Sequence, residues 1–563
     1  MAAPRETEPS SSTTSLSETT APSYVSTQNT TRNDALSEQE RLMKTIQDVV
    51  PSPSPNGFPS ERTPLLSTPH NSGIQDGIDE IPSQDKIPSM AMFWEELPTL
   101  TEAAVPLIAT QLLQFTMIIV PVVSIGHMST TALAGISLGS MTANVTGFSV
   151  IQGFCSALDT LMPSAWTSSH PEYVGLWAQR MSVVMACLMI PITITWFNAE
   201  SLLLHLKQDP EVAQLASQYL RWITLALPAF VFNTISRRYF QSQGLFTVPT
   251  RIILLVAPIN AFLGWFLVWG PKPFGMGFIG APMASMISYY LISIASFTYG
   301  AKYTDLRAWH PLTMRMFTHL GRLIRLGLAG VGQVCSEWWA WELVMLAASV
   351  LGPTALASQS VLLTSCSATF QVPFSIGVAS SVRIGNLLGE RRGRRAGVAA
   401  NTSFVMAVGV MLLTSAIFMT FRHSWGRLFN NDEAVVSLVA DVLPIGALFQ
   451  VFDGAVGVTG GIMRARGMQL VGAMLNLSGY YVVGIPLGLW LAFTKHLGLK
   501  GLWYGLTVAL IYCSVVTSYL CLTTDWDLEV EKVAVRLKEE ERLRHADTLK
   551  ADDGGERGDI VTE

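Results

Sequence analysis

The chain has little charge, and much of what it has lies at its two ends. Only 14% of the 563 residues are Asp, Glu, Lys or Arg, whereas 49% are hydrophobic and the mean hydropathy is +0.37. Soluble chains are usually about a quarter charged, so this composition argues against an ordinary soluble enzyme. Residues 1–96 hold 14 acidic and 6 basic groups and residues 525–563 hold 13 and 7, which leaves the body with 14 acidic against 23 basic groups.

The sequence also lacks the patterns of secretion, disulfide bonding and metal binding. Its first 17 residues contain no apolar core of a signal peptide, so we expect the N-terminus to stay in the cytosol. The six cysteines lie in apolar stretches without a Cys-x-x-Cys pair, which is typical of packing residues. The nine histidines fall in tails, loops or span ends. We therefore expect no metal site and no catalytic residues. A membrane-embedded enzyme is one alternative, but it would need such residues clustered in one site.

The two tails differ from the body in composition. Residues 1–92 are rich in Ser, Thr and Pro, which predicts a disordered cytosolic tail. Within it, Glu61, Leu65 and Leu66 resemble an acidic dileucine signal, which sorting adaptors read and which directs proteins to vacuolar or lysosomal membrane. Residues 525–563 form a second polar, cytosolic tail, with a possible surface helix at residues 529–549.

Long apolar runs fill the chain between the tails. Each run is near the length of about 20 residues that crosses a bilayer as a helix, which predicts an all-α integral membrane protein. The sequence predicts twelve spans, at residues 103–126, 131–157, 178–198, 214–236, 249–270, 279–301, 324–350, 354–380, 397–420, 436–462, 469–494 and 500–523.

The basic residues of the body support this topology. Sixteen of the 23 fall in loops on the side of both tails, as expected for a cytosolic side, so they indicate orientation and not nucleic-acid binding. The two halves also repeat each other: Gly244 matches Gly467, and Gly277-x-x-Gly280 matches Gly498-x-x-Gly501. We expect two six-helix lobes, an N-lobe at residues 98–303 and a C-lobe at 316–523, with a cavity between them.

Three acids lie in the interior of predicted spans: Glu337, Glu342 and Asp453. Inserting an acid at a helix centre costs on the order of 3 kcal/mol, so such groups are commonly functional. Burial favours the protonated carboxyl and an organic cation favours its ionised form, so these acids could exchange protons for cations. Buried acids that only bond to neighbours are the structural alternative. Glu337 and Glu342 lie about 140° apart on a helix, so they cannot both face one narrow site.

Four polar or aromatic residues complete the predicted substrate cavity: Gln111, Asn144, Trp338 and Trp341. Indole faces attract organic cations, although each Trp could equally pack or face lipid. Gln111 and Asn144 are uncharged polar groups at depth, so they could equally serve as hydrogen bonds between helices.

Residues 98–520 resemble the eukaryotic branch of the MATE (multidrug and toxic compound extrusion) family, in a fungal type of sequence. The matching stretches are Pro106 with Gln111, Gly126-His127, 143–149, 157–161, 337–342, 381–389, Asp453 with Arg464-x-x-Gly467-x-Gln469, and Tyr480-Tyr481 with Gly484-x-Pro486. The resemblance implies two lobes in a V shape and proton-coupled export, with coupling positions at Glu337, Glu342 and Asp453. The chain departs from the family after Asp159 and at Arg466, near the predicted inner gate.

We therefore expect a secondary antiporter that exports organic cations, drugs or amphipathic metabolites through the lipid bilayer of the vacuolar or plasma membrane, with both termini cytosolic. It should need no cofactor. A proton gradient should drive transport, and a sodium gradient is the alternative. A monomer is expected, with sorting adaptors as possible partners of the N-terminal tail and no nucleic acid. The alternatives are a flippase for lipids or oligosaccharides, with a wide basic cavity, and a non-transporting sensor.

Overall fold

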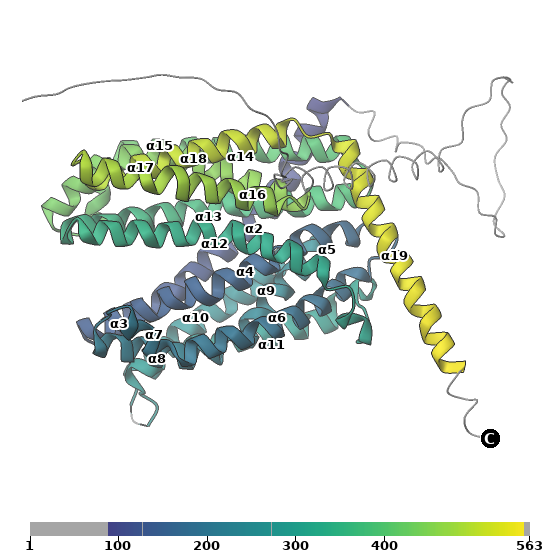
Figure 1. Cartoon of the computed structure of the whole chain (residues 1–563), viewed down its shortest axis with the longest axis horizontal. Coiled ribbons are helices and arrows are strands. Elements are labelled where there is room, and N and C mark those ends of the chain that lie inside the picture. The colour runs from purple at the N-terminus through teal and green to yellow at the C-terminus, as the bar shows by residue number, and fades with distance from the viewer. Residues whose placement is uncertain (1–87, 127, 272, 557–563) are drawn as a thin grey trace, which may run out of the picture. The chain divides into compact units, whose positions relative to one another are not determined.

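The computed structural model describes residues 88–126, 128–271 and 273–556, which form helices and contain no β-strand (Figure 1). We call residues 88–303 the N-half and residues 321–522 the C-half. The N-half contains α2 (Ser89–Gly126), α3 (Thr130–Ala143), the π-helix η2 (Asn144–Phe148), α4 (Ser149–Cys155), α5 (Leu158–Trp166), α6 (Tyr173–Phe197), α7 (Ala199–His205), α8 (Pro210–Thr224), α9 (Leu227–Ser242), α10 (Thr247–Trp269), η3 (Gly277–Ile279) and α11 (Gly280–Tyr303).

Two short 3-10 helices, η4 (Leu306–Ala308) and η5 (Met314–Phe317), lead from the N-half to the C-half. The C-half contains α12 (Gly321–Val350), α13 (Pro353–Gly389), α14 (Gly393–Trp425), η6 (Gly426–Leu428), α15 (Glu433–Ala465), α16 (Gln469–Leu477), the π-helix η7 (Ser478–Gly484), α17 (Ile485–Leu489), the π-helix η8 (Trp490–Thr494) and α18 (Leu499–Leu522). The final helix, α19 (Trp526–Glu556), follows after three residues.

Each predicted span coincides with a helix or a run of helices. The run from α16 to η8 covers residues 469–494 as predicted. Eight spans are long and apolar enough to cross a membrane, and the bent pair of α8 and α9 is a ninth. The other three predicted spans lie on α2, on α3 with α4, and on α12. Helix α2 begins at Ser89, so its first turn falls within the stretch 1–92 that was expected to be disordered.

The bend between α8 and α9 has a local cause. The two helices meet at 55°, and only Leu225 and Ala226 separate them. Pro228 lies in the first turn of α9, where its missing N–H costs nothing, but a proline there cannot continue the hydrogen bonding of α8. The chain therefore changes direction within one predicted span.

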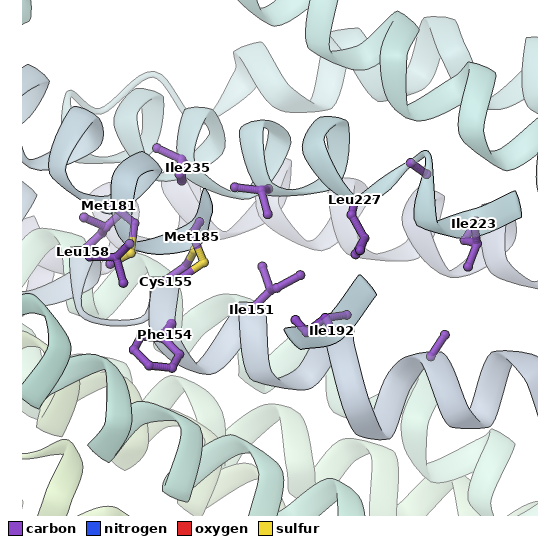
Figure 2. Close-up of a cluster of buried hydrophobic side chains, with 14 of the residues drawn as sticks. Ile151, Phe154, Cys155, Leu158, Met181, Met185, Ile192, Ile223, Leu227 and Ile235 are labelled. Carbon is purple, nitrogen blue, oxygen red and sulfur yellow. The ribbon is translucent and has the colours of Figure 1, made fainter. Parts of the chain in front are cut away.

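Apolar side chains both fill the halves and cover their outer surface. Figure 2 shows the core of the N-half, where α4, α5, α6, α8 and α9 contribute residues such as Ile151, Leu158 and Met185. Outward-facing residues include Leu255, which is 67% exposed, and Val482, which is 72% exposed. Large apolar side chains at such exposure are stable in lipid, where no water meets them.

The internal repeat seen in the sequence extends to the backbone. Gly244 and Gly467 have φ angles of +78° and +77°, and Gly277 and Gly498 have φ angles of +62° and +57°. This left-handed region suits glycine, which lacks a Cβ atom. The matched glycines therefore make equivalent turns in the two halves.

Candidate functional site

The three acids within spans do not form a single cluster. Glu337 and Glu342 lie on α12 and are half-buried, whereas Asp453 lies on α15 and is 7% exposed. Glu337 and Asp453 are close enough for their charges to interact, and Glu342 does not take part in that interaction. Within the described residues, neither member of the Glu337–Asp453 pair forms a hydrogen bond or an ion pair. The structure therefore pairs two of the acids and separates the third.

A polar region of the C-half surrounds the Glu337–Asp453 pair. Tyr480, which is buried in η7, lies within reach of both charges. The Tyr481 hydroxyl donates to the carbonyl oxygen of Ser336 at 3.1 Å, next to Glu337 in the chain. These contacts hold the wide π turn of η7 against α12. Single π turns inside α-helices often occur at functional sites.

The tryptophans of α12 have different surroundings. The Trp341 ring packs against Phe449 at 5.4 Å and Trp503 at 5.8 Å between centroids, which makes it part of the C-half core. Trp338 is 40% exposed. The indole nitrogen of Trp339 donates to the carbonyl oxygen of Val145 at 3.1 Å. Val145 belongs to η2, so Trp339 is the residue of this group that bonds to the N-half.

Gln111 also joins the two halves. Its Nε2 atom donates to Oε1 of Gln371 at 3.4 Å, and its Oε1 accepts from Arg237 at 3.3 Å. Arg237 donates to Gln114 as well, at 2.8 Å. Arg237 directly follows the predicted span 214–236 and was counted with the basic residues of the loops, but it lies within α9 because that helix extends to Ser242. Asn144 is half-buried and begins the π-helix η2.

An ion cluster that the sequence analysis missed links the halves. Asp159 on α5 accepts from Nε of Arg238 at 2.9 Å, and its other oxygen lies 3.5 Å from Nε of Arg464 on α15. All three side chains are between 10% and 13% exposed. The charge of Arg464 also acts on Glu337. Asp159 and Arg464 both lie in stretches that carry the family resemblance, and this is the feature of the sequence that could have pointed to the cluster.

The halves are also bonded at one end of the helices, where α2 begins, α13 ends at Gly389 and α18 ends at Leu522; we call it the terminal face. There, the Thr160 hydroxyl donates to the carbonyl oxygen of Arg464 and accepts from Gln469 at 2.7 Å. Thr167 donates to the carbonyl oxygen of Asn386 at 2.7 Å. The N-half and the C-half are therefore bonded together at this face.

Helix α2 reaches from the N-half to the C-half at the terminal face. Glu96 is fully buried and accepts two hydrogen bonds from Arg383, at 2.8 and 2.7 Å, and one from Arg395. Burial by itself would raise the pKa of Glu96, but the hydrogen bonds and charges of the two arginines outweigh it and lower the pKa below 4.5. Glu96 is therefore a permanent anion that holds the start of α2 against α13 and α14.

Close helix packing adds to this contact. A Cβ atom on Gly330 of α12 would lie 2.2 Å from the carbonyl oxygen of Gly153 on α4, and one on Gly389 would lie 2.5 Å from that of Ser164. Only glycine permits such a close approach. Small residues at these crossings let helices of opposite halves pack backbone against backbone, as helices in membranes commonly do.

Two further predictions concern metal and sorting. Among the described residues, no group of three His, Cys, Asp or Glu side chains is arranged to hold a metal ion. The predicted sorting residues Glu61, Leu65 and Leu66 lie outside the described residues.

Comparison with known proteins gives consistent matches over most of the membrane body. The family model MatE matches residues 106–266 and 331–490. An uncharacterized transporter of Schizosaccharomyces pombe is 36% identical over 467 residues, which are 83% of this chain and 86% of that protein. The mouse multidrug and toxin extrusion protein 2 is 33% identical over 442 residues, 78% of this chain and 77% of that protein.

A plant relative and a solved structure agree with these matches. Protein DETOXIFICATION 12 of Arabidopsis thaliana is 33% identical over 450 residues, 79% of this chain and 92% of that protein. The crystal structure of the eukaryotic MATE transporter AtDTX14 superposes with a TM-score of 0.75 and 29% identity, covering 79% of this chain and 99% of that one.

Proposed function

Since the chain belongs to the MatE family of multidrug and toxin extrusion transporters, we propose that it exports organic cations or amphipathic metabolites from the cytosol in exchange for protons. Like its relatives, it is a multi-pass membrane transporter and not an enzyme. The proton coupling and the class of cargo are our proposal.

The pairing of Glu337 with Asp453 carries this proposal. Two carboxyls that feel each other's charge do not both ionise readily, and in our proposal the pair holds a proton until a cation arrives. A bound organic cation would neutralise the pair and release the proton. If the protonated and cation-loaded forms favour opposite access states, proton entry drives cation exit.

The energetics suit this exchange. A pH difference of one unit supplies about 1.4 kcal/mol per proton, which sustains roughly tenfold accumulation at one-to-one exchange. Sodium could supply the same driving force through the same carboxyls, so the coupling ion is part of the test. No cofactor is required by this mechanism.

Other residues have supporting roles in the proposal. Glu342 would act as a separate site of proton or cation binding, because it lies apart from the Glu337–Asp453 pair. Trp338 could offer an indole face to the cation, since it is 40% exposed. Gln111 and Asn144 would line the path, and Trp341 would support α12 through its packing against Phe449.

Transport in liposomes tests the proposal. Purified protein is reconstituted with an acidic lumen, and uptake of a fluorescent organic cation is compared with and without the pH gradient and with a sodium gradient. We expect Glu337→Gln and Asp453→Asn each to reduce gradient-driven uptake at least about tenfold. Glu433→Gln is the control, because Glu433 is 80% exposed in its pair with Arg427. Gradient-independent uptake, or full uptake by both variants, contradicts the proposal.

The same assay distinguishes the alternatives. Protein-dependent movement of a labelled lipid across the bilayer, with no cation uptake, would indicate a flippase. Cation binding that quenches tryptophan fluorescence, without uptake of any cation tested, would indicate a sensor.

We also propose the orientation and surroundings of the chain. The terminal face would be cytosolic, supported by the excess of Lys and Arg in its loops. The vacuolar and plasma membranes are the proposed locations, with Glu61, Leu65 and Leu66 as the residues that sorting adaptors would read. A monomer is the proposed working form.

A further inference from the structure

Helix α19, which follows the last membrane span, contacts both halves at the terminal face. It leaves the end of α18 and runs past α5 and α6 of the N-half (Figure 1). Its contacts fall into two groups, which we call the C-anchor (residues 526–533) and the N-anchor (residues 536–544).

The C-anchor is a packed contact with the C-half. The Trp526 ring covers Gly397 of α14, where a Cβ atom would lie 2.7 Å from Trp526 Cδ1. The Arg466 guanidinium lies 5.9 Å from the centroid of the same ring and pairs with Glu529 at 3.1 Å. Val533 is 4% exposed. This contact is also tied to α18 through the chain, so it cannot separate far from the C-half.

The N-anchor consists of charged contacts. Arg536 donates to Oγ of Ser164 at 2.8 Å and to the carbonyl oxygen of Thr160 at 3.4 Å. Arg544 pairs with Glu172 at 2.8 Å. Glu540 pairs with Arg180 of α6 at 3.0 Å and with Arg322, at the start of α12 in the C-half, at 3.2 Å, so it bridges the two halves. Glu539 also pairs with Arg322, and Glu541 lies 3.5 Å from His170.

The N-anchor holds the segment that closes the terminal face. Thr160 and Ser164 lie on α5, and Thr160 also bonds to Arg464 and Gln469 of the C-half. If α5 moved away from α13 and α15, either the C-anchor or the N-anchor of α19 would have to break. The helix and the direct contacts of α5 therefore stabilise the same closed arrangement.

We propose that α19 is a strap that keeps the terminal face closed, and that when this face opens it releases the contacts of the N-anchor with the N-half while it keeps the C-anchor. The N-anchor is the contact that breaks, because its charged groups regain water when they are released. Breaking the C-anchor would instead expose the apolar side chains of Trp526 and Val533 to water. The proposal rests on the proposed function in one respect: the terminal face must open to admit cargo.

Such a strap sets the balance between closed and open states. A contact made only in the closed state shifts the population toward it and makes opening less frequent. Since part of the N-anchor is exposed, with Arg544 at 41% and Glu172 at 29%, high salt should weaken it.

Distances measured between two spin labels test the strap. Ser169 in the N-half and Glu390 in the C-half are both exposed near the terminal face, so we label Ser169→Cys and Glu390→Cys in full-length protein carrying Cys187→Ser. The test variant is Arg536→Gln with Arg544→Gln. Its matched control is Lys538→Gln with Arg542→Gln, which removes the same charge from exposed positions of the same helix.

We expect the test variant to enlarge the population at long distance at least about threefold, and the control to match the wild type. The single variant Arg536→Gln leaves no ion-pair partner behind, because Arg536 donates to a hydroxyl and a carbonyl oxygen, and it should show a smaller increase. Raising NaCl from about 0.05 M to about 1 M should open the wild type more than the test variant. Unchanged distances in the test variant at both salt concentrations would overturn the strap.

The measurement is independent of proton coupling. It requires no transported cargo, so the strap can fail while Glu337 and Asp453 still drive uptake, and the reverse can also occur. Size-exclusion profiles identify a variant that does not fold, and in that case Arg536→Gln alone decides the result: longer distances support the strap, and unchanged distances refute it.

Discussion

At the scale of residues, the buried acids of this transporter are of two kinds. Some are bonded to arginines, and the two acids of the Glu337–Asp453 pair are not. Glu96 is held by two arginines and Asp159 by two others, so each of these acids has fixed cationic partners at the terminal face. Glu337 and Asp453 form no hydrogen bond or ion pair among the described residues, although the charge of Arg464 acts on Glu337 from a distance. A carboxyl with permanent cationic partners is already neutralised, whereas the Glu337–Asp453 pair is the one that we propose binds a cation.

Asp159 should be important for stability as well as for closure. In Asp159→Asn, the nearly buried Arg238 and Arg464 lose their anion, so we expect a loss of about 3 kcal/mol in the free energy of unfolding. Unfolding by SDS titration in mild detergent measures this change.

The matched control is Glu200→Gln. Glu200 pairs with Arg221 at 3.3 Å, but both side chains are more than 40% exposed. An exposed pair contributes about 0–1 kcal/mol. Equal losses in the two variants would show that the Asp159 cluster is not an essential link.

At the scale of elements, the π segments place side chains that a regular helix would orient otherwise. In η2, the Thr146 hydroxyl accepts from the indole nitrogen of Trp196 at 2.8 Å, and the Val145 carbonyl accepts from Trp339. Sequence periodicity predicted one uninterrupted span here, because apolar patterns do not distinguish a π turn from an α turn. The span and its limits were predicted, but the local widening was not.

The close fit of η2 predicts the effect of a single methyl group. A Cβ atom on Gly147 would lie 2.4 Å from the ring of the fully buried Trp196. We expect Gly147→Ala to destabilise the protein by about 1–3 kcal/mol, since the ring cannot move without losing its hydrogen bond to Thr146. Thermal unfolding of the purified protein is the measurement.

Gly409→Ala is the control for this substitution. Gly409 lies inside α14, and a Cβ atom added there would meet no neighbouring atom within 4 Å. Alanine in a helix interior is more favourable than glycine by roughly 0.5–1 kcal/mol. The two substitutions should therefore shift the unfolding temperature in opposite directions, and shifts of the same sign would contradict the packing argument.

At the scale of the whole molecule, the terminal face brings several direct contacts between the halves together with the contacts of α19. Glu96, Thr160, Thr167 and the two anchors of α19 all bond there across the halves or to both of them. Breaking one contact leaves the others, so opening requires a concerted change. That is the behaviour expected of a transporter with discrete access states.

The proposed orientation makes a prediction about the whole chain. In intact cells with the protein in the plasma membrane, a membrane-impermeant maleimide should label Gln208→Cys, which is exposed after α7, but not Ser169→Cys. Permeabilised cells should label both. The reverse pattern would place the terminal face outside, since the two positions lie on opposite sides of span α6 in the chain. If the protein resides in the vacuole, isolated intact vacuoles reverse the expected roles, because their outer surface faces the cytosol.

The sequence by itself determined where the helical spans lie along the chain, though not where each helix ends, and the identity of the acids within them. It could do so because the bilayer requires about 20 apolar residues for each crossing and makes each buried charge costly, and both constraints act on local sequence. The turns at Gly244 and Gly467 could be matched for the same reason, since their backbone conformation depends on the local residue.

Only the tertiary structure decided which of these groups meet. The charge of Glu337 interacts with that of Asp453, more than a hundred residues away, whereas Glu342 on the same helix as Glu337 takes no part in that interaction. Arg237 turned out to bond to Gln111 and Gln114, and Arg536 to α5, although both had the appearance of loop or tail charges. Such pairings depend on which distant helices pack together, and the local pattern of hydropathy and charge does not predict that packing.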